Sequence, residues 1–157
     1  MNERPSDIHL PSIVSQFARM YPREIFNHRI SGPNGKPVNV ARTLEILSRP
    51  GVYILYRDDH PYYIGKAKRL RSRLFSHARR PGSKYDLFWN YFSVFVVEDP
   101  KHRAEVEAML IAAIPTANGA KPKLENHPYP DAVRRVMKIS QAGVLLKGVK
   151  GTNGTEE

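Results

Sequence analysis

Two tyrosines stand at a spacing that can bring their hydroxyl groups together. Tyr53 lies in the β-prone run Gly51 to Tyr56 (GVYILY), and Tyr63 lies in the second run, Tyr62 to Gly65 (YYIG). The turn-like residues between the runs, Arg57 to Pro61 (RDDHP), predict a β-hairpin with a five-residue loop. A loop of odd length puts residues of equal parity on one face, so both hydroxyls should point to one side. Such hydroxyls can move protons in catalysis, although a pair of tyrosines on strands usually fills a core.

A helix follows the hairpin at once, so its side chains can reach the same place. The spacing predicts this helix over residues 67–78, with Lys66 directly before it. Arg73 and His77 lie one turn apart on a stripe that borders the apolar one. We expect both groups to be half-buried beside the sheet. The alternative for any single arginine here is an ordinary solvated charge.

The charge of the chain is concentrated in this segment. Lys and Arg number 25 against 15 Asp and Glu, which gives a net charge of +10 and a pI near 10.0. Residues 66–80 contain no acid and seven bases: Lys66, Lys68, Arg69, Arg71, Arg73, Arg79 and Arg80. A localised surplus of this kind is typical of a polyanionic partner, most often nucleic acid. Lys66, Lys68, Arg69 and Arg71 are the residues we expect to contact this substrate.

A carboxylate interrupts an apolar helix face further along. Asp99 and Pro100 are typical of a helix start, and this helix should run to about residue 113. One stripe of it consists of Ala104, Glu107, Ile111 and Ile114. A buried carboxylate needs a cation, so Glu107 predicts either a metal site or a structural salt bridge. Glu105 points elsewhere on the helix and should be exposed.

The order of the remaining elements indicates an α+β fold, with a small antiparallel sheet of about three strands flanked by helices. We also expect helices over residues 10–20, 38–47 and 131–139, a loop over 31–37, and a third strand within 91–97. The predicted domains are a helical extension (1–49), a central domain (50–120), a C-terminal extension with a short helix (121–147) and a disordered tail (148–157).

Several classes of protein are excluded by what the sequence lacks. The chain has no cysteine, which excludes disulfides, a thiolate nucleophile and a cysteine zinc site. No run approaches the roughly 18 to 20 apolar residues of a membrane span, and the first residues do not resemble a signal peptide. A cytoplasmic protein without a membrane is therefore expected. The usual phosphate loops and the HExxH zinc motif are missing as well.

The chemically interesting residues together resemble the GIY-YIG nuclease superfamily over about residues 50–120. The resemblance is carried by Gly51-Val52-Tyr53, Tyr63-Ile64-Gly65, Lys66, Arg73, Glu107 and Asn118. The run GKAKRLRSRL looks like the amino-terminal incision domain of bacterial excision-repair nucleases, whereas His77 is closer to the homing endonucleases. Two departures are Val52 in place of isoleucine and a distance from Glu107 to Asn118 that is one residue shorter.

The resemblance implies an endonuclease that hydrolyses phosphodiester bonds of DNA with one divalent cation. Glu107 would hold one Mg²⁺ or Mn²⁺ ion together with water molecules. Arg73 would clamp the scissile phosphate, and His77 would assist or bind phosphate. Asn118 would orient a neighbouring group.

The resemblance also implies roles for the tyrosines, Tyr53 taking a proton from the attacking water and Tyr63 positioning water or phosphate. Either tyrosine can be the base in this family, and that choice stays open. A Tyr pKa near 10 would have to fall by about 2 to 3 units for this role.

Two other classes of function compete with a nuclease. A basic α+β module that binds nucleic acid without cutting it explains the charge but leaves Glu107 unexplained. A structural interaction protein explains neither. The oligomeric state is open, and a homodimer would suit a double-strand cut by a single site per chain.

Overall fold

The computed structural model describes residues 12–79, 88–119, 124–125 and 128–139. The chain divides into two compact units, Met1–Leu124 and Glu125–Glu157. In the second unit residues 131–139 form the expected helix. The tail predicted to be disordered, residues 148–157, lies outside the described residues.

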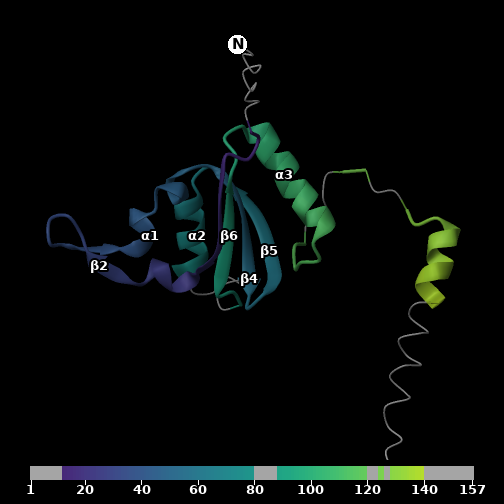
Figure 1. The fold of residues 1–157 in the computed structure, drawn as a ribbon, viewed down its shortest axis with the longest axis horizontal. Coiled ribbons are helices and arrows are strands. Elements are labelled where there is room, and N and C mark those ends of the chain that lie inside the picture. The colour runs from purple at the N-terminus through teal and green to yellow at the C-terminus, as the bar shows by residue number, and fades with distance from the viewer. Residues whose placement is uncertain (1–11, 80–87, 120–123, 126–127, 140–157) are drawn as a thin grey trace, which may run out of the picture. The chain divides into compact units, whose positions relative to one another are not determined.

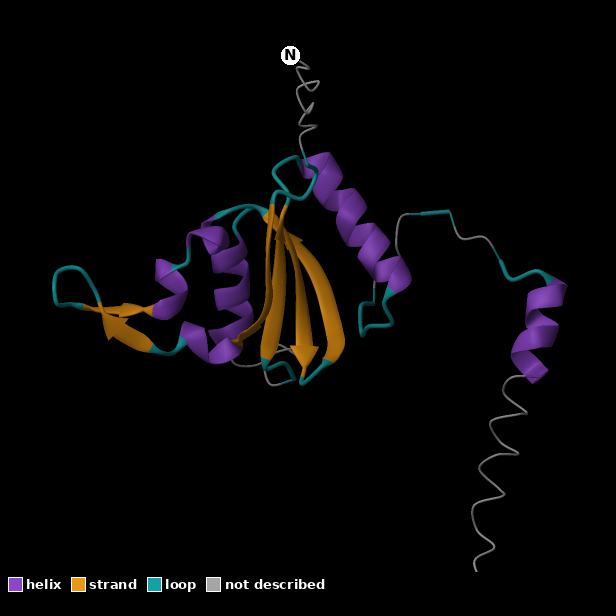
Figure 2. Ribbon diagram, in the orientation of Figure 1, coloured by secondary structure: helices purple, strands orange, loops and turns teal. Residues whose placement is uncertain are grey.

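The first unit is built on an antiparallel sheet with the strand order β1-β6-β4-β5 (Figures 1 and 2). Its strands are β1 (Gln16–Pro22), β4 (Gly51–Arg57), β5 (His60–Ala67) and β6 (Tyr91–Val96). A second sheet of two strands consists of β2 (Arg29–Ser31) and β3 (Pro37–Asn39), and residues 32–36 form the expected loop between them. The sequence predicted an α+β fold with three of the four main strands, and the fold class is confirmed.

The fourth strand, β1, replaces an expected helix. The prediction of a helix over residues 10–20 is wrong, because residues 16–22 pair antiparallel with β6, with Phe17 opposite Phe95 and Ala18 opposite Val94. Ala18 is buried while Phe17 is 68% exposed, which is the alternation of a strand and not a helical stripe. The hydrogen bonds offered by the edge of β6 outweigh the weak helical spacing of the apolar residues.

The helices flank the sheet on two sides. They are α1 (Val40–Thr43), α2 (Leu70–Arg79) and α3 (Pro100–Ala113), with short 3₁₀ turns η1 (Arg23–Phe26) and η2 (Glu45–Ser48). The helix expected over residues 38–47 is present only as α1 and η2, because Leu44 between them has extended dihedral angles. The helix expected over 67–78 begins three residues later, since Ala67 still belongs to β5. As expected, the Asp99 side chain caps α3 by accepting hydrogen bonds from two backbone amides.

Each face of the main sheet has its own core. On one face, Tyr53 and Leu55 pack with Leu70 and Leu74 of α2. On the other face Val52, Ile54 and Ile64 pack against α3, whose contributing residues are Val106, Leu110, Ile111 and Ile114. The alternation along β4 therefore directs Tyr53 toward α2, and α3 covers the opposite face (Figure 1). Among the described residues, no helix is both long enough and apolar enough to cross a membrane.

Candidate active site

The β4–β5 hairpin brings the two tyrosines together on the face of α2. The register places Tyr53 opposite Gly65 and Tyr63 opposite Leu55. The turn has two residues instead of the expected five, and a register shift between Leu55 and Tyr56 restores the parity. The ring centroids of Tyr53 and Tyr63 are 6.1 Å apart. The shared face that the sequence predicted is confirmed, although the predicted loop was too long.

Gly65 allows this arrangement. A Cβ atom at this position would clash with the hydroxyl and the ring of Tyr53. The glycine of the second motif therefore makes room for the first tyrosine, whose ring lies directly over the strand.

The Tyr53 hydroxyl is the centre of a polar cluster in the core. Its oxygen lies 2.8 Å from His77 Nε2, and it accepts a hydrogen bond from Arg73 Nε at 3.3 Å. Tyr53 is fully buried, and this burial raises its pKa well above the usual value of 10.0, against the opposing effect of Arg73. The phenol therefore stays protonated at neutral pH, within hydrogen-bond distance of His77 Nε2. The hydrogen bond that Arg73 donates to Tyr53 also raises the pKa of Arg73, which keeps its charge.

Tyr63 is the more accessible of the two hydroxyl groups. Its side chain is partly buried, it interacts with both Tyr53 and Arg73, and its ring centroid lies 5.8 Å from that of His77. Tyr53 has no exposed surface, and both of its hydroxyl contacts are occupied. This geometry does not favour the expectation that Tyr53 takes a proton from water.

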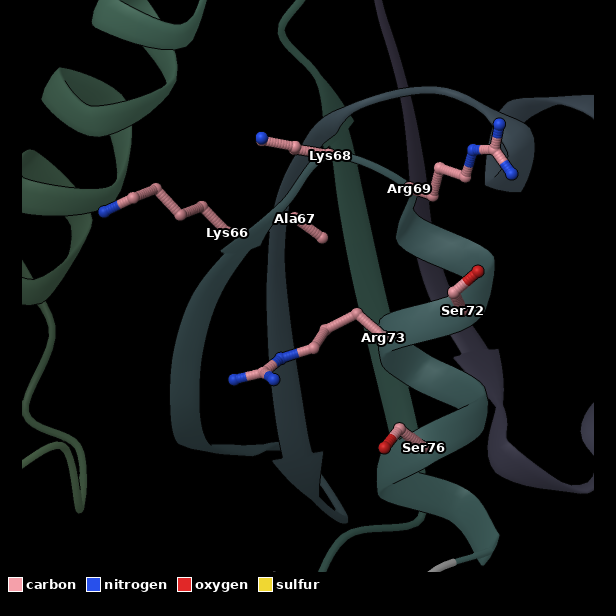
Figure 3. Close-up of a pocket in the computed structure, with 7 residues that line it drawn as sticks. All are labelled: Lys66, Ala67, Lys68, Arg69, Ser72, Arg73 and Ser76. Atoms are coloured by element: carbon pink, nitrogen blue, oxygen red, sulfur yellow. The ribbon is translucent and has the colours of Figure 1, made fainter.

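A basic hollow opens next to this cluster. It has a volume of about 640 Å³ and is lined by Lys66, Ala67, Lys68, Arg69, Ser72, Arg73 and Ser76 (Figure 3). In Figure 3 the guanidinium group of Arg73 extends from α2 toward β5, and Lys66 extends toward α3. No carboxylate belongs to the described lining, so the hollow is suited to a polyanion.

Arg71 is not part of this hollow. Its guanidinium donates hydrogen bonds to the carbonyl oxygens of Ala41 at 3.1 Å and Leu44 at 2.8 Å. These bonds tie α2 to the end of α1. Of the four bases expected to contact substrate, the structure brings Lys66, Lys68 and Arg69 together and turns Arg71 into a structural contact.

Glu107 is half-buried on α3, and its carboxylate pairs with the ammonium group of Lys66. Its side chain is 18% exposed and that of Lys66 is 47% exposed. Glu105 is exposed, as expected, but Ala104 is exposed as well, so the predicted stripe was partly wrong. Glu107 belongs to α3, which packs on the face of the sheet opposite the one that carries the rings of Tyr53 and Tyr63.

Glu107 offers a single carboxylate to a cation, and in this structure that carboxylate is paired with Lys66. Within the residues that the structure describes, no group of three or more His, Cys, Asp or Glu side chains could hold a metal. Zinc sites need several such ligands, whereas Mg²⁺ accepts one carboxylate with several water molecules. The single carboxylate of Glu107 is enough for the requirement of Mg²⁺.

Asn118 acts on the backbone of β5. Its Nδ2 donates to the carbonyl oxygen of Ile64 at 2.7 Å, and its Oδ1 accepts from the Ile64 amide at 2.9 Å. The neighbouring Ala117 amide donates to the carbonyl of Tyr62. Asn118 therefore holds the strand that carries Tyr63.

Residues 49–113 match a family model described as the GIY-YIG catalytic domain. The chain belongs to the GIY-YIG superfamily.

Three relatives illustrate the similarity of this GIY-YIG domain to known proteins. The chain is 36% identical over 75 residues to the UvrABC system protein C of Methanosphaera stadtmanae, a match that covers 43% of this chain and 12% of that protein. It is 57% identical over 37 residues to the same protein of Pseudothermotoga lettingae, covering 23% and 7% of the two chains. The magnesium-bound N-terminal endonuclease domain of UvrC from Thermotoga maritima is 34% identical, with a TM-score of 0.39 over 46% of this chain and 86% of that one. The chain thus spans a small fraction of the length of the curated relatives that it matches.

Two serines of the GIY-YIG domain lie at the site although they were not predicted from the sequence. Ser72 and Ser76 line the basic hollow together with Arg69 and Arg73. The spacing of three, one and three residues between these four positions is that of one helical face, which was the available signal.

Proposed function

We propose that the chain is a metal-dependent DNA endonuclease that hydrolyses phosphodiester bonds at the site described above. One observation carries the proposal. Arg73 stands at the wall of a basic hollow and donates to the buried Tyr53 hydroxyl, so it joins a phosphate-binding surface to a proton-transfer cluster. A module that only binds nucleic acid needs the surface but not the cluster.

DNA is the proposed substrate because of the charge of the hollow. The described lining contains four bases, two serine hydroxyls and no carboxylate. Such a surface attracts phosphate groups at any sequence, and the serine hydroxyls add hydrogen-bond donors.

Arg73 is the proposed phosphate clamp. Its guanidinium group is hydrogen-bonded to both Tyr53 and Tyr63, which fixes the plane of the group and lets its planar fork present N–H donors to a phosphoryl oxygen. The charge of Arg73 is maintained by the same hydrogen bonds, so it can stabilise the negative charge that grows in the transition state.

Glu107 is the proposed ligand of a single Mg²⁺ or Mn²⁺ ion. A cation held there would polarise a phosphoryl oxygen and help the leaving oxygen. Lys66 now neutralises Glu107, and because it also lines the hollow it can contact a phosphate instead.

The tyrosines have different proposed roles. Tyr63, the partly exposed one, would face the attacking water and accept its proton. Tyr53 would hold Arg73 in place and pass a hydrogen bond to His77. This assignment reverses the roles first expected from the sequence, because burial raises the pKa of Tyr53.

Cleavage of a supercoiled plasmid tests the proposal directly. We expect the purified chain to convert supercoiled DNA to nicked or linear forms with Mg²⁺ and to leave it intact with EDTA. A chain that shifts the mobility of the plasmid but never cuts it, with Mg²⁺ or Mn²⁺, would instead be the non-cleaving binding module.

A further inference from the structure

A second basic hollow lies on the other side of α2, next to the β2–β3 hairpin. The hairpin projects away from the main sheet beyond α1 and α2 (Figure 1). It precedes residues 49–113, so it is not part of the matched catalytic domain. All three residues of β2 are exposed, including Ile30 at 43%. This ribbon therefore presents most of its surface to whatever approaches the molecule.

Three arginines from separate elements converge on this hollow of about 240 Å³. Arg29 comes from β2, Arg42 from α1 and Arg79 from the end of α2. The other lining residues are Pro37, Val38, Asn39 and Phe75, so the described lining holds no carboxylate. Among the described residues, no acid forms an ion pair with any of the three arginines.

Arg79 is held in position within this hollow. Its guanidinium lies 4.6 Å from the ring centroid of Phe75 and donates to the carbonyl oxygen of Phe26 at 3.3 Å. A guanidinium fixed in this way loses little conformational freedom when it binds an anion. Arg29 and Arg42 are exposed and complete a site for phosphate oxygens.

The sequence around the hairpin also favours binding of an anion. The 20 residues between Glu24 and Glu45 contain no acid but include Arg29, Lys36 and Arg42. The positive charge of the hairpin is therefore unopposed along the chain, which is the pattern of a surface that tracks a polyanion.

The two hollows share one helix. Ser76 and Arg73 of α2 line the first hollow, whereas Phe75 and Arg79 line the second. An α-helix with its side chains is about 10 Å across, and three base pairs of DNA extend about 10 Å along the duplex axis. A single duplex lying across the exposed face of α2 reaches both hollows.

We propose that the second hollow, together with the β2–β3 hairpin, binds backbone phosphates of the DNA that flanks the bond to be cut. This inference rests on the proposed function for the identity of the ligand. It adds an anchor built mainly from residues that precede the matched catalytic domain, and this anchor holds the duplex without taking part in hydrolysis.

The test is the salt dependence of DNA binding by the full chain, measured by fluorescence anisotropy on a duplex of about 30 base pairs with Ca²⁺ in place of Mg²⁺. For the variant R29A/R42A we expect the slope of log affinity against log salt to fall by about 2, since each phosphate contact contributes about 0.9. We expect affinity at 0.1 M salt to fall by about 10-fold. The control R57A/K101A removes the same charge from exposed positions elsewhere and should change the slope much less.

The variant R29K/R42K keeps the charges and should restore most of the slope, which separates lost phosphate contacts from a change in fold. An unchanged slope in R29A/R42A, or an equal loss in R57A/K101A, would overturn the proposed anchor. Cleavage by the wild-type chain is scored separately. If the wild type binds the duplex but never cuts it, the proposed function fails while the slope of R29A/R42A still decides the anchor.

Discussion

The tyrosine cluster and the Lys66–Glu107 pair are both attached to β5, but they are built in opposite ways. The cluster lies on the α2 face, is closed off from solvent at Tyr53, and joins residues within one hairpin and the next helix. The Lys66–Glu107 pair connects β5 to α3, 41 residues further along, and its lysine is almost half exposed. Under the proposed function, the hydroxyl network would be fixed before substrate arrives, and Glu107 would exchange Lys66 for the metal ion.

The largest expected effect concerns the Lys66–Glu107 pair. Glu107→Gln should reduce Mg²⁺-dependent cleavage by about 1000-fold or more, because the proposed metal ligand is lost. Binding of DNA with Ca²⁺ should stay equal or improve, since a negative charge near the phosphates is removed. Because the ion pair with Lys66 is partly exposed, the free energy of unfolding should change by less than about 1 kcal/mol.

Glu105→Gln is the matched control, as Glu105 lies exposed on the same helix, and it should cut normally. Loss of cutting in Glu105→Gln with retention in Glu107→Gln would reverse the assignment of the carboxylate.

The next effect concerns the residue that joins the hollow to the tyrosine cluster. Arg73→Lys keeps the charge but cannot hold both Tyr53 and a phosphate through a planar fork. We expect cleavage to fall by about 100-fold while DNA affinity changes little. Single-turnover cleavage and anisotropy on the same duplex measure the two quantities. Full activity of the lysine variant would reduce Arg73 to a general positive charge.

The two tyrosines of the cluster should differ in how strongly their loss slows cleavage. Tyr63→Phe removes the proposed base and should lower the single-turnover rate by about 100-fold, whereas Tyr53→Phe should lower it by about 10-fold through a loosened Arg73. Both variants keep their rings and should remain folded. A larger loss of rate in Tyr53→Phe than in Tyr63→Phe would show that the buried tyrosine is the base. Wild-type rates in both variants would show that the two tyrosines only fill the core.

A smaller effect distinguishes two neighbouring bases by what they touch. Arg71→Ala should lower the free energy of unfolding by about 2 kcal/mol, because buried carbonyl groups at the end of α1 lose their charged donor. Arg69→Ala should leave stability unchanged and reduce the salt slope of DNA binding instead. Urea unfolding and anisotropy of both variants provide the comparison, which fails if Arg69 proves to be the stabilising residue.

The smallest effect is a loss of stability in alkali. Burial raises the pKa of Tyr53 in the folded chain above the 10.0 of an exposed tyrosine, so above pH 10 the unfolded chain releases a proton that the folded chain retains. The contribution of the protonated Tyr53 to the free energy of unfolding is fully present below pH 10. It should decline by about 1 kcal/mol between pH 10 and pH 11. Tyr53→Phe should lack this part of the decline in urea unfolding at the two pH values. Equal declines in both proteins would show that Tyr53 does not titrate as described.

Local patterns predicted the catalytic half of the fold well. The β4–β5 hairpin, β6 and the capped start of α3 each depend on a few adjacent residues, such as Asp99 at the start of the helix. The shared face of Tyr53 and Tyr63 was predicted although the loop was not, because the register shift offsets the shorter turn.

Long-range pairing explains the parts that were not predicted. β1 depends on hydrogen bonds to β6, more than 70 residues away, and Phe17 and Met20 happen to repeat at a helical spacing. The role of Arg71 could not be read from a run of bases, since it is decided by the carbonyl groups of α1.

The side chain of Asn118 has a consequence for self-association. The outer edge of β5 is a place where a strand of another chain could add itself, as at any open sheet edge. At Ile64 both backbone hydrogen-bonding groups are already taken by the amide of Asn118, and the Tyr62 carbonyl is taken by Ala117. Because Asn118 bonds only to the backbone of residue 64, these bonds do not depend on which side chain stands at that position. At positions 62 and 64, the strand that carries Tyr63 and Lys66 is thereby closed to edge-to-edge pairing with another chain.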